Sequence, residues 1–179
     1  MSDRITPDDK NWTWVLERRC EDCGFDASSF DSTRTPDALR DQVLRWTAVL
    51  EWEEVRTRPH LDVWSPLEYG CHIRDVFRKF DERLKLMLES VDPAFENWDQ
   101  DATAIKDRYD LQSPKTVVEQ LGEAGISLAK RFESVTLEQW TRRGFRSDGS
   151  VFTVDSIAKY LMHDPVHHLW DVGAEVPRY

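Results

Sequence analysis

The sequence predicts an all-α fold: a four-helix bundle with a long crossover between the second and third helices and a small hairpin before the fourth. Four segments carry apolar residues at steps of three and four, and each follows a Ser or Thr that can begin a helix. Glycine is scarce, with 7 among 179 residues, which suits long helices better than a turn-rich β-fold. One connection is far longer than the others, as in bundles that contain a crossover.

The first two helices have the clearest start signals. Thr35 can cap a helix over residues 36–55, and Pro36 suits its first turn because the N–H that proline lacks would have no partner there. A second helix follows Ser65 and spans residues 66–90. Its apolar stripe consists of Tyr69, Ile73, Val76, Phe77, Phe80, Leu84 and Met87.

The last two helices are expected over residues 114–132 and 153–172. The third follows Ser113, although Gly122 and Gly125 lower its intrinsic helix propensity. The fourth opens with a threonine that can cap it and carries its apolar residues at helical spacing.

The connections complete the predicted architecture. Residues 142–154 contain a Ser-Asp-Gly-Ser turn between short runs of alternating apolar and polar residues, which predicts a hairpin. Residues 91–112 form the long connector, which we interpret as a crossover, a functional loop, or both. We expect an N-terminal segment, residues 1–34 with a Cys-x-x-Cys pair, packed as one domain with the bundle of residues 35–179.

Composition narrows the class of protein. A formal net charge of −10 disfavours binding to the phosphates of nucleic acids. No run of about 18 apolar residues predicts a membrane span. The N-terminal residues MSDRITPDDKNW lack the apolar region of a signal peptide, and three cysteines are too few for a secreted disulfide framework. We therefore expect a cytoplasmic protein.

Histidines supply the main functional signal. His72 falls on the second predicted helix, and three more histidines, His163, His167 and His168, fall on the fourth. Side chains four residues apart share a helix face and can bind one metal ion together. A third ligand from the facing helix would leave a coordination position open, as in catalytic sites. The alternative is a buried hydrogen-bonded cluster of these histidines with nearby carboxylates, which are Asp75, Asp164 and Asp171.

Two short runs carry a family resemblance. WSPLEYGCH, which ends at His72, and HDPVHHLWD, over residues 163–171, together resemble the DinB/YfiT-like superfamily. The resemblance covers most of the chain from about Asp37 onward and implies a four-helix bundle with a crossover between the second and third helices. It also implies a divalent metal ion held by a histidine on the second helix and two ligands on the fourth. Relatives include mycothiol-dependent maleylpyruvate isomerase and other low-molecular-weight-thiol transferases.

Two ligand pairs are possible on the fourth helix. Read directly, the superfamily spacing gives His163 and His167. Aligned on the downstream Trp-Asp, as in the isomerase pattern Glu-x-x-x-His, it gives Asp164 and His168, and helical phase favours this second pair. Pro165 can kink the helix or admit a bulge, and either would rearrange both ligand pairs. The predicted metal ligands are therefore His72 and two of His163, His167 and His168, with Asp164 as the outside alternative.

Several other residues are candidates for roles near the site. Glu68 and Asp164 are candidate catalytic groups, but Ser65-x-x-Glu68 also fits a capping box. Asp75 either faces solvent or orients a ligand histidine. The connector offers either a substrate lid or a surface loop anchored by Trp98. The residues that would form such a lid are Trp98, Asp99, Asp101, Arg108 and Tyr109.

The Cys20-x-x-Cys23 pair resembles half of a zinc site, and no second such pair exists to complete four cysteines. It can recruit an Asp or His, form a redox disulfide, or remain as two free thiols. Cys71 is expected to pack in the core.

We interpret the chain as a metal-dependent transferase, isomerase or hydrolase in which a divalent metal activates a thiol or water. The expected metal is zinc, with nickel and iron as alternatives, and a low-molecular-weight thiol is a second expected cofactor. We expect a small-molecule substrate and consider a homodimer. The alternatives are a non-enzymatic metal-binding or redox-sensing protein that uses Cys20 and Cys23, and a helical interaction module.

Overall fold

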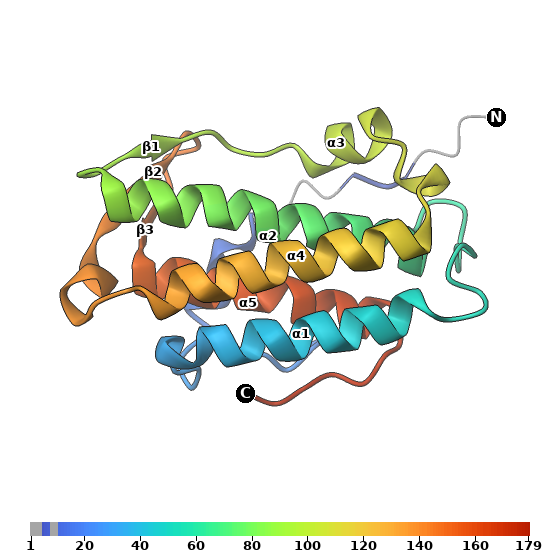
Figure 1. Ribbon diagram of the computed structural model, residues 1–179, viewed down its shortest axis with the longest axis horizontal. Coiled ribbons are helices and arrows are strands. Elements are labelled where there is room, and N and C mark those ends of the chain that lie inside the picture. Colours follow the sequence, from blue (N-terminus) through green and yellow to red (C-terminus); the bar gives the residue numbers. More distant parts are fainter. Residues whose placement is uncertain (1–4, 8–10) are drawn as a thin grey trace.

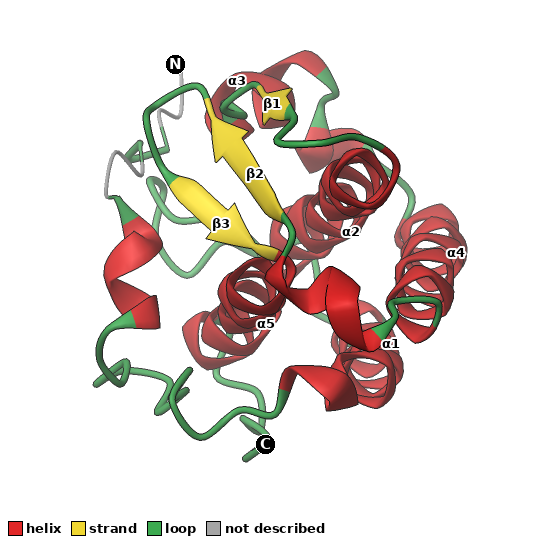
Figure 2. Ribbon diagram, turned by 90° about the vertical axis from the view of Figure 1, so that its left-hand side faces the viewer, coloured by secondary structure: helices red, strands yellow, loops and turns green. Residues whose placement is uncertain are grey.

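The computed structural model describes residues 5–7 and 11–179. Four long helices lie along the molecule (Figure 1). They are α1 (Thr35–Leu50), α2 (Pro66–Glu89), α4 (Pro114–Glu133) and α5 (Val154–Asp171). Seen end-on, α4 packs between α1 and α2, and α5 lies at the opposite corner against the same two helices (Figure 2).

The segment between α2 and α4 carries the chain back along the bundle, so that both helices begin at the same end (Figure 1). It contains strand β1 (Ala94–Phe95) and a short helix, α3 (Gln100–Lys106). No helix was expected in this connector. A helix start signal was nevertheless present in Asp99. Its carboxylate accepts the backbone N–H of Ala102 at 2.8 Å and so caps α3.

The predicted hairpin is confirmed. Strands β2 (Arg143–Arg146) and β3 (Val151–Thr153) pair antiparallel, and Gly149 takes φ +91° in the turn between them. β1 adds a third strand, parallel to β2, which the sequence analysis did not anticipate. Two residues are too short a run to predict a strand without knowing its partner.

The start of α2 is predicted well, and the limits of α1 less well. Ser65 and Glu68 form the expected capping box at the start of α2. Thr35 is the first residue of α1 rather than its cap, and its hydroxyl donates to the Ser32 carbonyl at 2.7 Å. α1 ends at Leu50 instead of continuing to residue 55. Residues 51–55 include three glutamates. In a helix that continued to residue 55 they would form the last turn, where the negative end of the macrodipole disfavours them.

The N-terminal segment covers one side of α5. Its described residues form two short 3₁₀ helices, η1 (Trp12–Leu16) and η2 (Ser32–Arg34), and the loop between them contributes buried side chains to the core. These include Phe25 and Phe30, which are 6% and 5% exposed. In the bundle itself, Trp46 is fully buried. Among the described residues, no helix combines the length and apolar character that a bilayer crossing requires.

α5 is continuous through Pro165. Proline removes one backbone donor from a helix interior, so a kink or bulge was one expected outcome at this position. The helix shows no π-turn there. Because the helical phase is kept, neighbouring residues of α5 project about 100° apart. This regularity decides which side chains can meet across the bundle.

Candidate metal centre

Three side chains from α2 and α5 converge on one point. His72 Nε2 lies 3.2 Å from Asp164 Oδ1, and His168 Nε2 lies 3.6 Å from the same oxygen. His72 is fully buried, while Asp164 and His168 are partly accessible. Bonds of about 2.0–2.2 Å at tetrahedral angles would put a nitrogen and an oxygen ligand roughly 3.4 Å apart. The observed separations bracket that value, so this donor set fits a metal ion.

The surroundings of these three groups favour metal binding. Burial alone would raise the pKa of Asp164, but the adjacent His72 and His168 imidazoles lower it to about 2, so the carboxylate is charged near neutral pH. His168 Nδ1 lies 2.6 Å from Asp171 Oδ2. A carboxylate on the second nitrogen fixes the tautomer and orientation of a ligand histidine. On the other side, the Trp98 ring stacks on His72 with an interplanar angle of 4°.

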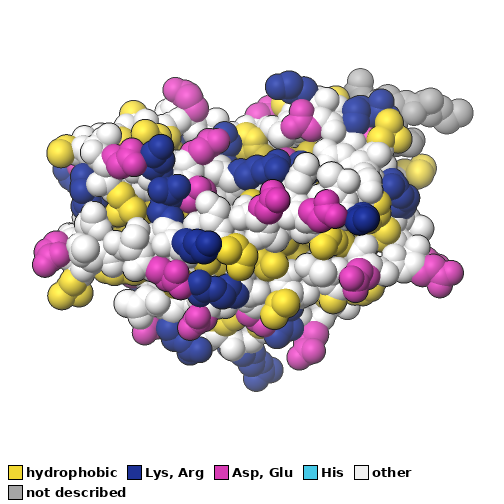
Figure 3. Space-filling view, viewed as in Figure 1, with side chains coloured by type: hydrophobic (Ala, Val, Ile, Leu, Met, Phe, Trp, Pro, Cys, Tyr) yellow, Lys and Arg dark blue, Asp and Glu magenta, His cyan; other side chains and the backbone are white. Residues whose placement is uncertain are grey.

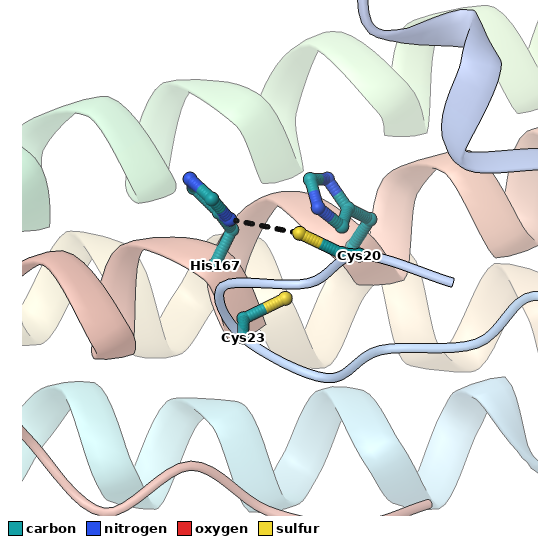
Figure 4. Close-up of side chains that lie close together, drawn as sticks. Cys20, Cys23 and His167 are labelled. Atoms are coloured by element: carbon teal, nitrogen blue, oxygen red, sulfur yellow. Dashed lines mark hydrogen bonds between the residues drawn. The ribbon is translucent and has the colours of Figure 1, made fainter. Parts of the chain in front are cut away.

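A second group lies between the N-terminal loop and the neighbouring face of α5. Cys20, Cys23, His163 and His167 are all buried, and one potential ligand atom from each lies within 4.8 Å of the others. Figure 4 shows Cys20 and Cys23 on one loop beside α5, with the Cys20 sulfur directed at His167; Cys20 Sγ lies 3.6 Å from His167 Nδ1. Burial raises the pKa of the Cys23 thiol to about 12 and lowers the pKa of His163 to about 3. Burial likewise lowers the pKa of His167.

The predicted ligands are thus divided between two groups. His72 and His168 lie with Asp164, whereas His163 and His167 lie with the cysteines. The reason is the unbroken phase of α5, which directs each pair of residues four apart to a different side. Cys-x-x-Cys and His-x-x-x-His are recognisable signals for a shared site. About 140 residues separate them in the sequence, so only the tertiary structure brings them together.

A cleft of about 500 Å³ borders the first group at Asp164. Its wall includes Trp98, Tyr160 and two arginines that sequence analysis did not single out, Arg83 and Arg146. Arg83 is 5% exposed, and no carboxylate of the described residues forms an ion pair with it. Burial and the nearby Arg146 lower the pKa of Arg83 to about 10, which still leaves it charged near neutral pH. A cationic group that pairs with no anion in the described part of the chain thus lines the cleft beside the candidate metal ligands.

Glu68 and Asp75 lie outside both groups. Glu68 caps α2 and pairs with Arg58. Asp75 does not orient a histidine; its carboxylate pairs with Arg74 at 2.8 Å and accepts the Tyr109 hydroxyl at 2.6 Å. The connector is therefore anchored to α2 through Tyr109, which is 1% exposed.

Of the predicted lid residues, several border the 500 Å³ cleft, and they are Trp98, Asp99 and Asp101. Arg108 and Tyr109 do not line it, and Arg108 pairs with Asp110 at 2.9 Å. On the face shown in Figure 3, acidic and basic side chains are interspersed rather than gathered by sign.

Comparisons with known proteins bear on the fold and the family of the chain. The structure is similar to YfiT from Bacillus subtilis, with a TM-score of 0.61 and 17% sequence identity, covering 96% of this chain and 95% of that one. At this identity the likeness shows the fold. YfiT is described as "a probable metal-dependent hydrolase with an unusual four-helix bundle topology". A search of curated proteins gave no match. A family model for the DinB superfamily matches residues 36–172, and the chain therefore belongs to that superfamily.

Proposed function

We propose that this chain is a metal-dependent enzyme whose divalent ion is held by His72, Asp164 and His168. The observation that carries the proposal is the convergence of these three donors at the edge of a cleft. Three protein ligands leave a coordination position for a substrate or water, which distinguishes catalytic from structural sites. We take zinc as the expected ion, because imidazole and carboxylate ligands suit it.

The ion would lower the pKa of a coordinated thiol or water and polarise an electrophile. The protein positions the reacting groups. Asp171 holds the His168 ring with Nε2 directed at Asp164, and Trp98 covers the buried His72 ring. Arg83, which has no anionic partner among the described residues, is placed to bind a carboxylate of the substrate in the cleft.

The nucleophile we propose is a low-molecular-weight thiol, with water as the alternative. Support for the thiol comes from the resemblance to mycothiol-dependent isomerases and transferases. Support for water comes from the description of YfiT as a hydrolase. The two differ in the product: a thiol adds its sulfur to the electrophile and releases its proton, whereas water cleaves an ester or amide.

Metal content and activity measured on the same samples test the proposal. Untagged wild-type protein would be assayed with small thiols plus model electrophiles, and separately with ester and amide substrates, each with and without a carboxylate. We expect turnover that His72→Ala abolishes together with the metal of this site. His60→Ala is the matched control, because His60 is exposed and belongs to neither group.

The outcomes separate the alternatives. Turnover only with thiols identifies a transferase or isomerase, and turnover only of esters or amides identifies a hydrolase. A preference for carboxylate-bearing substrates supports the role of Arg83. Full occupancy of this site with no turnover of either kind would contradict an enzymatic function.

Redox sensing by Cys20 and Cys23 is less well supported. Sensor cysteines are accessible and have a low pKa. Here Cys20 and Cys23 are only 1% and 9% exposed, and burial raises the pKa of Cys23.

A further inference from the structure

The group formed by Cys20, Cys23, His163 and His167 has the composition of a complete metal site. It offers two sulfur and two imidazole nitrogen donors, and these atoms lie within 4.8 Å of one another. Two thiolates and two imidazoles are one of the standard ligand sets of structural zinc. We propose that these four residues bind a structural zinc ion, separate from the metal of the proposed active site.

The backbone of the N-terminal loop prepares the two cysteines for this role. The Gly24 N–H donates to the Cys20 carbonyl at 3.0 Å, and the Cys20 N–H donates to the Phe25 carbonyl at 2.9 Å. Gly24 takes φ +76°, a left-handed conformation that glycine adopts without strain. This tight turn folds the chain back at the second cysteine and keeps both side chains on the α5 side of the loop (Figure 4).

The distances on the histidine side also fit. Zinc bonds of about 2.3 Å to sulfur and 2.0–2.1 Å to nitrogen, at the tetrahedral angle, place the two ligand atoms roughly 3.5–3.6 Å apart. Cys20 Sγ and His167 Nδ1 are 3.6 Å apart. The His167 Nε2 atom faces Asp171 Oδ1 at 3.9 Å, on the side of the ring away from the cysteine.

Burial and charge support the same conclusion. All four side chains are buried, and His163 Nε2 has no hydrogen-bond partner among the described residues. Buried polar groups are rarely left unpaired, so this atom calls for an explanation. A zinc ion with two thiolates and two neutral imidazoles carries no net charge, and the two thiol protons leave to solvent on binding. Such a site can be buried without an unpaired charge.

The role of the proposed zinc ion follows from its complete shell of protein ligands and from its position in the fold. Four protein ligands complete a tetrahedral shell, so the ion would have no position for a substrate. The site joins the N-terminal loop to α5 next to Asp164 and His168, which face the proposed active site. Trp12 packs against both histidines, with ring centroids 5.4 Å from His163 and 5.0 Å from His167. The zinc would therefore fix the N-terminal segment and the rotation of α5 that aims the catalytic ligands.

Spectroscopy of the whole wild-type protein tests this site directly. X-ray absorption at the zinc edge should show a component with two sulfur and two nitrogen neighbours. Cobalt substitution should add a sulfur-to-cobalt charge-transfer band. The proposal would be overturned by spectra without a sulfur component, recorded on protein whose Cys20 and Cys23 thiols titrate freely or are joined in a disulfide.

Metal counting on variants gives the second test. We expect two zinc equivalents per wild-type chain when both sites are filled, and one fewer in Cys20→Ser and Cys23→Ser. Cys71→Ser is the matched control, since Cys71 is also buried but belongs to neither group, and it should keep two. His72→Ala should lose the other equivalent and retain the sulfur-ligated one, so failure of this site and failure of the active site are distinguishable. Equal zinc contents in the wild type and both cysteine variants would contradict the proposal.

Discussion

Asp171 connects the two candidate metal groups at the scale of single residues. One carboxylate oxygen lies 2.6 Å from His168 Nδ1, and the other lies 3.9 Å from His167 Nε2. The residue lies at the end of α5, one turn after the histidines that it faces. A carboxylate in this place keeps the outer ring nitrogen protonated and leaves the inner nitrogen free to bind metal.

We predict that Asp171→Asn weakens metal binding at the His72 site by about 10–100-fold, the usual effect of removing such a carboxylate. The affinity can be measured by competition with a chromogenic chelator. Asp155→Asn is the control, since Asp155 lies on the same helix but pairs with Lys159 at 2.9 Å. Equal affinities in the two variants would show that Asp171 does not orient a ligand.

Glu68 has a structural role at the start of α2. Burial opposes its ionisation, but hydrogen bonds from Arg58 and Ser65 outweigh that effect and lower its pKa. Its side chain is 4% exposed. A carboxylate with a lowered pKa stabilises the fold above its unfolded pKa of about 4.3, and this contribution is lost as the pH falls towards the folded value.

Glu68→Gln should therefore lower the free energy of unfolding near neutral pH by about 1.5–3 kcal/mol, as for hydrogen bonds to charged groups. The difference from wild type should shrink below about pH 4, where the unfolded carboxylate becomes protonated. Thermal unfolding across a pH series measures this. The metal content should not change. A loss of turnover with unchanged stability would instead indicate a catalytic Glu68.

Among the elements, the sequence predicted in part which side chains of α5 share a helix face. The spacing predicted two pairs four residues apart on α5, and the apolar residues of that helix favoured Asp164 and His168 for the side facing His72. What faces the other pair could not be predicted. The Cys-x-x-Cys loop reaches α5 through tertiary packing, which a one-dimensional pattern does not encode.

The glycines of α4 were read from the sequence only as weak helix formers, and the packing gives one of them a further role. A Cβ at Gly125 would collide with Val43 of α1 and lie 3.2 Å from the Phe77 ring of α2, so this glycine lets three helices approach closely. At Gly122, an added Cβ would meet only Val43 Cγ1 at 4.0 Å, which is ordinary contact.

The two glycine-to-alanine variants should therefore have opposite effects. Gly122→Ala should raise the free energy of unfolding by about 0.5–1 kcal/mol, the gain in helix propensity. Gly125→Ala should lower it, because overpacking costs about 1–3 kcal/mol and outweighs that gain. Urea unfolding of both variants measures the difference. Equal stabilisation by both would mean that α1 and α2 do not press on Gly125.

At the scale of the whole molecule, the chain combines a DinB-type bundle with an N-terminal segment that packs on α5 and lies before the matched residues 36–172. The four long helices and the hairpin follow from local start signals and periodicity, which is why the sequence predicts them well. The third strand, the pairing of Tyr109 with Asp75 and the cleft arginines depend on contacts between distant segments. Those features could not be predicted from the sequence alone.

Metal binding should stabilise the whole fold. A ligand at 100 times its dissociation constant adds about 2.7 kcal/mol to the free energy of unfolding, which corresponds to a rise in Tm of roughly 5–10 °C for a chain of this size. Calorimetry of chelator-treated protein, before and after zinc is restored, measures the shift. His72→Ala combined with Cys20→Ser should show no shift. An unchanged Tm in the wild type would argue against metal binding by the folded chain.

Anomalous diffraction at the absorption edge of the bound metal would locate the proposed active-site ion directly. For crystals of wild-type protein, we predict a peak at about 2.0–2.2 Å from His72 Nε2, an Asp164 oxygen and His168 Nε2, with a further non-protein ligand on the open side. Crystals grown with zinc that show these three side chains ordered and no peak between them would contradict it.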